Sequence, residues 1–127
     1  MSATEVKDDR KYTKDHEWLS DDGKVGITAF AVDQLGDITL VDITVKPGDV
    51  IEPGAAFGTI ESVKTLSDLF APVGGKVVAV NGELEDKPEL INDDCWSAGW
   101  MIQLEGAEGG DLMDPATYGK HLEESDH

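Results

Sequence analysis

Residues 57–70 read Phe-Gly-Thr-Ile-Glu-Ser-Val-Lys-Thr-Leu-Ser-Asp-Leu-Phe, and this stretch decides the fold class. Residues 57–61 and 66–70 each have the length and the apolar content of a short strand. Residues 62–65 between them are few enough to form a hairpin turn. We therefore predict a β-hairpin that carries Lys64 at its tip.

Further short strands are predicted on both sides of this hairpin. Residues 12–27 read as a second hairpin, because Asp22-Gly23 is a strong turn signal between two apolar runs. Residues 37–45 and 100–104 read as strands, and shorter apolar runs lie at 50–51 and 75–80, between turns rich in Pro and Gly. Short strands with frequent turns indicate a β-barrel or sandwich, not alternating strands and helices.

Two short helices are expected beside these strands. Thr28 is placed to cap a helix of about two turns that Gly36 ends, since glycine readily adopts the left-handed conformation found there. Asp114 and Pro115 are a typical helix start, and they predict a C-terminal helix over about 114–124 that Gly119 weakens. We expect the last five residues, 123–127, to be disordered.

Size and composition predict one soluble domain. The chain has 127 residues, with 39% hydrophobic and 29% charged residues. This length supports a single domain over 1–127 with a core of about 11–105. No apolar run is long enough to span a bilayer, which excludes a membrane protein, and residues 1–11 lack the apolar centre of a secretory signal. We expect a cytoplasmic monomer.

The charge balance excludes one class of partner and suggests a habitat. Asp and Glu number 27 against ten Lys and Arg, which gives a net charge of −17. Such a chain repels a nucleic-acid backbone, so nucleic-acid binding is set aside. Self-repulsion of this size is reduced by salt, and a salt-rich cytoplasm is therefore our hypothesis.

The sequence offers no catalytic machinery. It has no Gly-rich phosphate loop, no metal-ligand cluster and no nucleophile with its base, so we expect a protein that is not an enzyme. His16 has no Ser or Cys nucleophile evident near it, and we interpret it as a hydrogen-bonded structural residue. Cys95, the single cysteine, is interpreted as a buried or half-buried small apolar residue.

Residues 58–68 resemble the lipoylation site of the glycine cleavage H proteins. Motifs similar to those of the same family occur in the family's order at residues 12–18, 25–28, 34–37, 70–75 and 88–92. The resemblance covers roughly residues 11–105. It departs from the family pattern at Cys95-Trp96, where Pro-Tyr is more usual, and at residues 45–48, which read Val-Lys-Pro-Gly in place of Leu-Pro-Glu-x-Gly. Neither departure touches the modification site.

The resemblance implies a fold, a cofactor and a set of partners. The fold would be mainly β, a barrel-sandwich hybrid like that of lipoyl and biotinyl carriers, and Lys64 would carry lipoate in amide linkage. The protein would take an aminomethyl group from a pyridoxal phosphate-dependent glycine decarboxylase to a tetrahydrofolate-dependent aminomethyltransferase. Dihydrolipoyl dehydrogenase would reoxidise its dithiol, and a lipoate-attaching enzyme would modify it.

The resemblance also places acidic residues at a surface cleft, and Glu17 and Asp68 are the acids that would hold the charged aminomethyl group. Because the chain has 27 acids, the interpretation of these two as ordinary surface carboxylates stays open.

Other carriers remain as alternatives. A biotin carrier would have Met on both sides of the lysine, whereas Val63 and Thr65 stand here. The lipoyl domain of a 2-oxoacid dehydrogenase usually reads Asp-Lys-Ala at its tip. A lipoyl-relay carrier or a lipoyl domain that serves such a dehydrogenase is the alternative function, and an ordinary solvated turn lysine is the alternative for Lys64.

Overall fold

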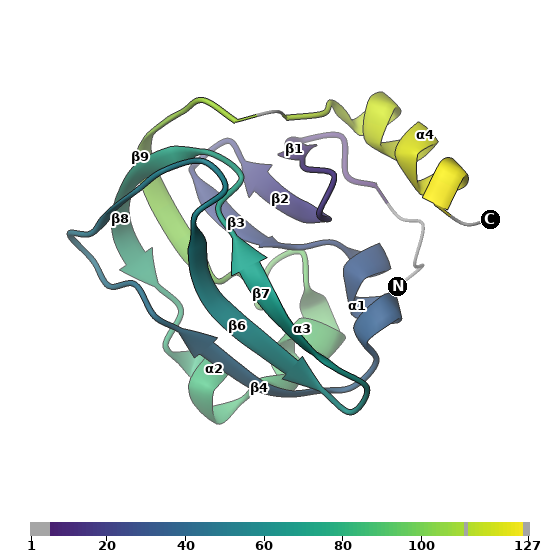
Figure 1. Cartoon of the computed structure of the whole chain (residues 1–127), viewed down its shortest axis with the longest axis horizontal. Coiled ribbons are helices and arrows are strands. Elements are labelled where there is room, and N and C mark those ends of the chain that lie inside the picture. Colours follow the sequence, from purple (N-terminus) through teal and green to yellow (C-terminus); the bar gives the residue numbers. More distant parts are fainter. Residues whose placement is uncertain (1–5, 111, 126–127) are drawn as a thin grey trace.

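Two antiparallel β-sheets enclose the core of the protein. A computed structural model of the chain describes residues 6–110 and 112–125. The larger sheet has the strand order β1-β2-β3-β9-β8-β5, and the smaller sheet has the order β4-β6-β7 (Figure 1). Their strands are β1 (Arg10–Tyr12), β2 (Glu17–Ser20), β3 (Lys24–Ile27), β4 (Ile38–Ile43), β5 (Val50–Ile51), β6 (Ala56–Ser62), β7 (Leu66–Phe70), β8 (Gly74–Val80) and β9 (Ile102–Glu108).

Residues 6–110 and 112–125 form four helices around the sheets. They are α1 (Ala29–Leu35), α2 (Glu83–Asp86), α3 (Glu89–Asp94) and α4 (Pro115–Ser125). Thr28 caps α1 as predicted, because its hydroxyl accepts a hydrogen bond from the Ala31 amide, and Gly36 ends the helix with φ of 81°. Asp114 caps α4 through the Thr117 amide at 2.7 Å. No helix of the described residues is long and apolar enough to cross a lipid bilayer.

The predicted class, a mainly β carrier-like fold, is confirmed, although the two sheets do not close into a barrel. The hairpin of 12–27 gains a third strand, β1. Helices α2 and α3 were not predicted. The prediction that residues 123–127 are disordered is wrong for 123–125, because α4 continues to Ser125. Residues 126 and 127 lie outside the described residues.

The core is continuous between the sheets and includes Trp18, Phe57 and Val77, all at most 1% exposed. The Trp18 indole donates to the carbonyl oxygens of Ile27 and Cys95, both at 3.0 Å. Cys95 is buried, as predicted.

Trp96, one of the departures from the family pattern, helps to hold the N-terminal strand. The Arg10 guanidinium lies 4.5 Å from the ring centroid of Trp18 and 5.4 Å from that of Trp96. It also donates to the Trp96 carbonyl at 2.8 Å. Cation–π contacts and a charge-assisted hydrogen bond therefore join β1 to the segment after α3.

Helix α4 packs beside β1, far along the chain from it (Figure 1). Tyr118 stacks on Tyr12 with ring centroids 4.4 Å apart and planes 7° apart. The Tyr118 hydroxyl lies 2.8 Å from Nδ1 of His16 and 2.7 Å from the Thr28 hydroxyl. One phenol thus connects α4 to the start of β2 and to the cap of α1.

Candidate functional site

The tip of the β6–β7 hairpin is a tight turn built around Ser62. The Ser62 amide donates to the Thr65 carbonyl at 2.8 Å, and its hydroxyl oxygen accepts from the Lys64 and Thr65 amides, both at 3.2 Å. Ser62 is buried, whereas the Lys64 side chain is exposed. The prediction of Lys64 at a hairpin tip thus agrees with the geometry, and this tip is fixed by its own hydrogen bonds.

The tip is also tied to the segment that follows α1. The Val63 amide donates to the Asp37 carbonyl at 3.1 Å. The Asn92 side chain on α3 holds the residues on both sides of Asp37: Nδ2 donates to the Gly36 carbonyl at 3.0 Å, and Oδ1 accepts from the Ile38 amide at 2.9 Å. Three segments far apart in sequence therefore position the backbone of the lysine turn.

The stem of Lys64 lies over Gly36. A Cβ atom at Gly36 would stand 3.4 Å from Cε of Lys64 and 3.7 Å from its Cδ. The lysine chain therefore runs along the end of α1, within van der Waals reach of the Gly36 position. The amine is thereby exposed while its stem has a defined direction.

A cavity of about 350 Å³ lies between α1 and β7. Its apolar wall comes mainly from α1, the end of β3 and the inner face of the β6–β7 hairpin, and it consists of Ile27, Phe30, Ala31, Leu35, Ile60 and Leu69. Glu17 and Asp68 both line the cavity, so the structure brings these two predicted residues to one place. Lys64 is not among the lining residues, and its stem points along the Gly36 end of α1 instead.

The two acids occupy different positions in this cavity. Glu17 is 3% exposed and forms part of its wall. Asp68 is exposed and pairs in register with Thr59, while its neighbour Leu69 is buried in the core. Because side chains alternate along a strand, Asp68 points to the face opposite Leu69 and reaches the cavity at its rim.

Burial determines the ionisation of Glu17. Loss of solvent raises the pKa of its carboxyl from 4.5 to about 7, and the nearby charge of Asp15 acts in the same direction. The hydrogen bond from Thr13 and one from the Phe70 backbone act against this rise. Glu17 thus reaches from β2 to β7 and joins the two sheets.

His16 is a structural residue, as predicted, because its Nδ1 is hydrogen-bonded to the Tyr118 hydroxyl. Its ring lies 4.6 Å from that of Phe30, and burial, with the nearby charge of His121, lowers the pKa of His16 to about 4. Its φ of 68° is unusual for a residue other than glycine and is held by two backbone hydrogen bonds, from His16 to Thr13 and from Thr28 to His16. The neutral imidazole forms a rigid side of the cavity.

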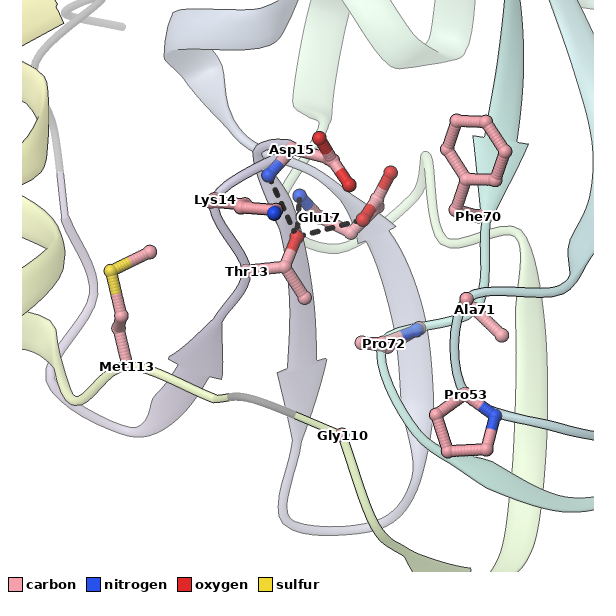
Figure 2. A pocket seen from close by; sticks show the side chains of 11 residues that line it. Thr13, Lys14, Asp15, Glu17, Pro53, Phe70, Ala71, Pro72, Gly110 and Met113 are labelled. Carbon is pink, nitrogen blue, oxygen red and sulfur yellow. Dashed lines mark hydrogen bonds between the residues drawn. The ribbon is translucent and has the colours of Figure 1, made fainter.

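A second cavity, of about 600 Å³, adjoins the first and shares Asp15 and Glu17 with it. Figure 2 shows Thr13, Asp15 and Glu17 on one side of this cavity and Phe70, Ala71, Pro72 and Pro53 on the other. Glu17 therefore lies in a wall that borders both spaces.

Sequence reasoning missed two residues that build the site. Thr13 holds the Glu17 carboxyl, and Asn92 holds the support of the lysine turn. The available signals were the position of Thr13 four residues before Glu17 and the position of Asn92 within a family motif. In the described part of the chain no group of His, Cys, Asp or Glu could hold a metal ion. The geometry is that of a rigid turn that presents an amine beside an apolar cavity with a buried acid.

Comparison with known proteins assigns this geometry to a family. The family model described as Glycine cleavage H-protein matches residues 10–125. The chain belongs to this family. The glycine cleavage system H protein of Koribacter versatilis is 51% identical over 123 residues, which cover 94% of this chain and 96% of that relative. That of Listeria monocytogenes serotype 4a is 53% identical over 107 residues, 82% of this chain and 85% of the relative.

A solved member of the glycine cleavage H-protein family has the same fold. The crystal structure of the H protein from Mycobacterium marinum superposes with a TM-score of 0.82 at 35% identity, and it covers 96% of this chain and 100% of that one. The resemblance inferred from residues 58–68 and the surrounding motifs is therefore confirmed at the level of the family.

Proposed function

We propose that this chain is the lipoyl-carrying shuttle of a glycine cleavage system and that Lys64 is its attachment residue. The observation that carries the proposal is the exposed Lys64 amine on a turn fixed by Ser62 and Asp37. An acylating enzyme needs an accessible primary amine on a protruding turn, and a shuttle needs that turn to be rigid. Family membership supplies the system in which the shuttle acts.

The residues around Lys64 fit a lipoyl group. The lysine stem runs beside Gly36, and the cavity beside α1 has the apolar wall that a hydrocarbon arm requires. When attached, lipoate supplies a dithiolane that alternates between disulfide and thiol forms and takes up the cargo. The protein supplies a direction for the lysine stem, along the end of α1, and an apolar space beside the arm.

Glu17 and Asp68 are proposed to hold the cargo. An aminomethyl group bears an ammonium, which a carboxylate pairs with by a charge-assisted hydrogen bond. Glu17 in the wall and Asp68 at the rim give the cavity two such carboxyls. The apolar residues around them limit the access of water, which otherwise releases the cargo.

The partners follow from the same proposal. Glycine decarboxylase loads the arm, the tetrahydrofolate-dependent aminomethyltransferase unloads it, and dihydrolipoyl dehydrogenase reoxidises it. A lipoate-attaching enzyme modifies Lys64. The continuous core is consistent with a single carrier domain. We propose that this domain acts as a monomer in the cytoplasm, without catalysis of its own.

Replacement of the lysine tests the proposal. Lys64→Arg keeps the positive charge but offers no amine that can be acylated. We expect protein from its native host to carry one lipoyl group on Lys64, and the variant to lose both the modification and glycine exchange with the purified partner enzymes. Amide formation removes one positive charge, so the formal net charge moves from −17 to −17 − 1 = −18.

The matched control is Lys76→Arg, an exposed lysine on β8. It should keep lipoylation and exchange at the wild-type level, and both variants should melt as the wild type does. Intact mass and peptide mapping give the site. A lipoyl group found on another lysine, or normal exchange by Lys64→Arg, would refute the assignment.

A further inference from the structure

Thr13 makes an unusual set of hydrogen bonds at the start of the β1–β2 loop. Its hydroxyl donates to Oε1 of Glu17 at 2.7 Å. The Thr13 hydroxyl oxygen, Oγ1, also accepts hydrogen bonds from the backbone amides of Asp15 at 3.3 Å and Glu17 at 3.2 Å. Thr13 is itself buried. One hydroxyl therefore fixes both the fold of the loop and the rotamer of the Glu17 side chain.

The geometry leaves the other carboxyl oxygen of Glu17 away from Thr13. In Figure 2 that oxygen points into the space between Asp15 and Phe70, while the first oxygen faces the Thr13 hydroxyl. The carboxyl can still accept a hydrogen bond there, because each carboxylate oxygen has two lone-pair positions. Without the contact to Thr13, the hydrogen bond from the Phe70 backbone would remain, and the glutamate side chain would be held less firmly between the two cavities that it borders.

We propose that Thr13 is a positioning residue of the shuttle: its hydroxyl holds the Glu17 carboxyl in the orientation and the ionised form that receive the ammonium of the cargo. This inference rests on the proposed function, in which Glu17 contacts the loaded arm. Thr13 lines the adjoining cavity and not the one beside α1, and it acts through Glu17.

The ionised form of Glu17 needs support because burial of the carboxyl favours the protonated form. Burial raises the pKa of Glu17 to about 7, and the hydrogen bond from Thr13 lowers it. The titratable groups around Glu17 are Asp15 and Lys14 on its own loop, His16 beside it, Asp68 on β7 and Tyr118 on α4. A donor that favours the carboxylate thus offsets desolvation.

Docking of the cargo then moves a proton. Where Glu17 is protonated, its O–H bond breaks as the ammonium arrives, the electron pair stays on the carboxylate, and water accepts the proton. The ammonium keeps its own protons and pairs with the carboxylate. The step needs no oxidant and no further reactant.

The first test measures the pKa of the Glu17 carboxyl in unlipoylated protein. We expect the pKa of the Glu17 carboxyl, followed by carbon NMR, to rise by about one unit in Thr13→Val, because the donor is lost. Thr13→Ser keeps the donor and should restore the wild-type value. Thr39→Val is the matched control, since the Thr39 hydroxyl donates to the Glu61 carbonyl near the other end of the hairpin. An unchanged pKa in Thr13→Val would overturn the proposal.

The second test measures loss of the cargo from loaded protein without the transferase, as released formaldehyde and ammonia. A pKa rise from about 7 to about 8 reduces the carboxylate fraction at pH 7 from about one half to about one tenth. Where the cargo is mostly docked, its release is inversely proportional to this fraction and should be roughly fivefold faster; where it is docked only about half of the time, release should be about twofold faster. Thr13→Ser and Thr39→Val should release the group as the wild type does.

The two tests separate the failure of this inference from that of the proposed function. If Glu17→Gln releases the cargo no faster than the wild type, the role of Glu17 in the proposed function fails, whatever the NMR result. If Glu17→Gln is faster but Thr13→Val is not, the positioning role of Thr13 is overturned alone. Should Thr13→Val not fold, Thr13→Ala removes the same oxygen with less bulk at the buried position.

Discussion

Asn92 holds Gly36: the side-chain amide of Asn92 donates to the Gly36 carbonyl oxygen at 3.0 Å. The carbonyl oxygen of the same side chain accepts from the Ile38 amide at 2.9 Å. Between these two contacts, Asp37 accepts the hydrogen bond from Val63 at the lysine turn. A half-buried residue on α3 therefore supports the turn that presents Lys64, although it touches neither Lys64 nor the cavity beside α1.

Replacement of Asn92 should weaken this support. Asn92→Ala leaves the Gly36 carbonyl and the Ile38 amide without their partner, so we expect a loss of about 1–3 kcal/mol of unfolding free energy. Lipoylation of Lys64 should slow severalfold, because the turn is held less firmly. Urea denaturation and the initial rate of lipoylation measure the two effects. The control is Asp93→Ala at the exposed neighbouring position, and equal behaviour of the two variants would contradict the prediction.

The opposite pKa shifts of Glu17 and His16 predict a specific pH dependence of stability. Folding raises the pKa of Glu17 from 4.5 to about 7, so its stabilising contribution is fully present below pH 4.5 and is lost as the pH rises through about 7. Folding lowers the pKa of His16 from 6.5 to about 4, so its contribution is present above pH 6.5 and is lost as the pH falls toward 4. The two slopes oppose each other between pH 4.5 and 6.5.

Single variants should separate the two opposing contributions to the pH dependence of the unfolding free energy. In Glu17→Gln, the unfolding free energy should rise with pH through this window, and at pH 8 the variant should exceed the wild type by an amount of order 3 kcal/mol. In His16→Asn, which tolerates the positive φ, stability should instead fall with rising pH. Urea titrations at several pH values check both. Parallel pH profiles for the wild type and the two variants would show that neither group titrates as stated.

The fold was predictable where local signals were strong. The hairpin of 57–70, the Thr28 cap and the Asp114-Pro115 helix start each depend on neighbouring residues alone, and each agrees with the structure. Helices α2 and α3 have only four and six residues, and isolated helices of this length are not stable. They form because Leu84 and Ile91 are buried in the core, which no local pattern reveals.

The sequence proposes the residues of the site, but it does not show how these residues are arranged. Lys64 follows from the motif around it, and Glu17 and Asp68 follow from the resemblance to a family. That Glu17 is buried while Asp68 lies at the rim depends on strand register, and burial controls the pKa of Glu17. The supporting contacts of Thr13 and Asn92 likewise need the coordinates of side chains, because only those show which donor meets which acceptor.

Salt should stabilise the protein. Even if every Lys and Arg were paired with one acid, 27 − 10 = 17 acids would remain. On the outer face of the smaller sheet, Asp42 and Asp68 both flank Thr59 in register, and two strand spacings place them about 10 Å apart. Salt screens charges at such distances, so the melting temperature should rise from low to molar salt.

Removal of one of these charges gives the matched comparison. Asp42→Asn should raise the melting temperature at low salt, with a gain of a few tenths of a kcal/mol in unfolding free energy, and this gain should disappear at high salt. Calorimetry across the salt series measures it. A melting temperature that stays constant in salt would indicate that the acidic charges are well dispersed, and it would remove the basis for a salt-rich habitat.

The last prediction concerns retention of the cargo by Glu17 and Asp68. Glu17→Gln and Asp68→Asn together should speed release of the aminomethyl group without the transferase, because each removes a carboxylate that can pair with the ammonium. If each contact is worth about 1–2 kcal/mol in the loaded state, its loss changes the rate by several-fold to about thirtyfold. Burial strengthens such contacts, so Glu17 in the wall should contribute more than Asp68 at the rim. The control is Asp42→Asn, whose side chain lies on the outer face of the same sheet and does not line the cavity. Lipoylation of Lys64 should remain near the wild-type level in all variants, since the turn and its supports are unchanged. Release from the double variant at the wild-type rate would show that neither carboxyl retains the cargo.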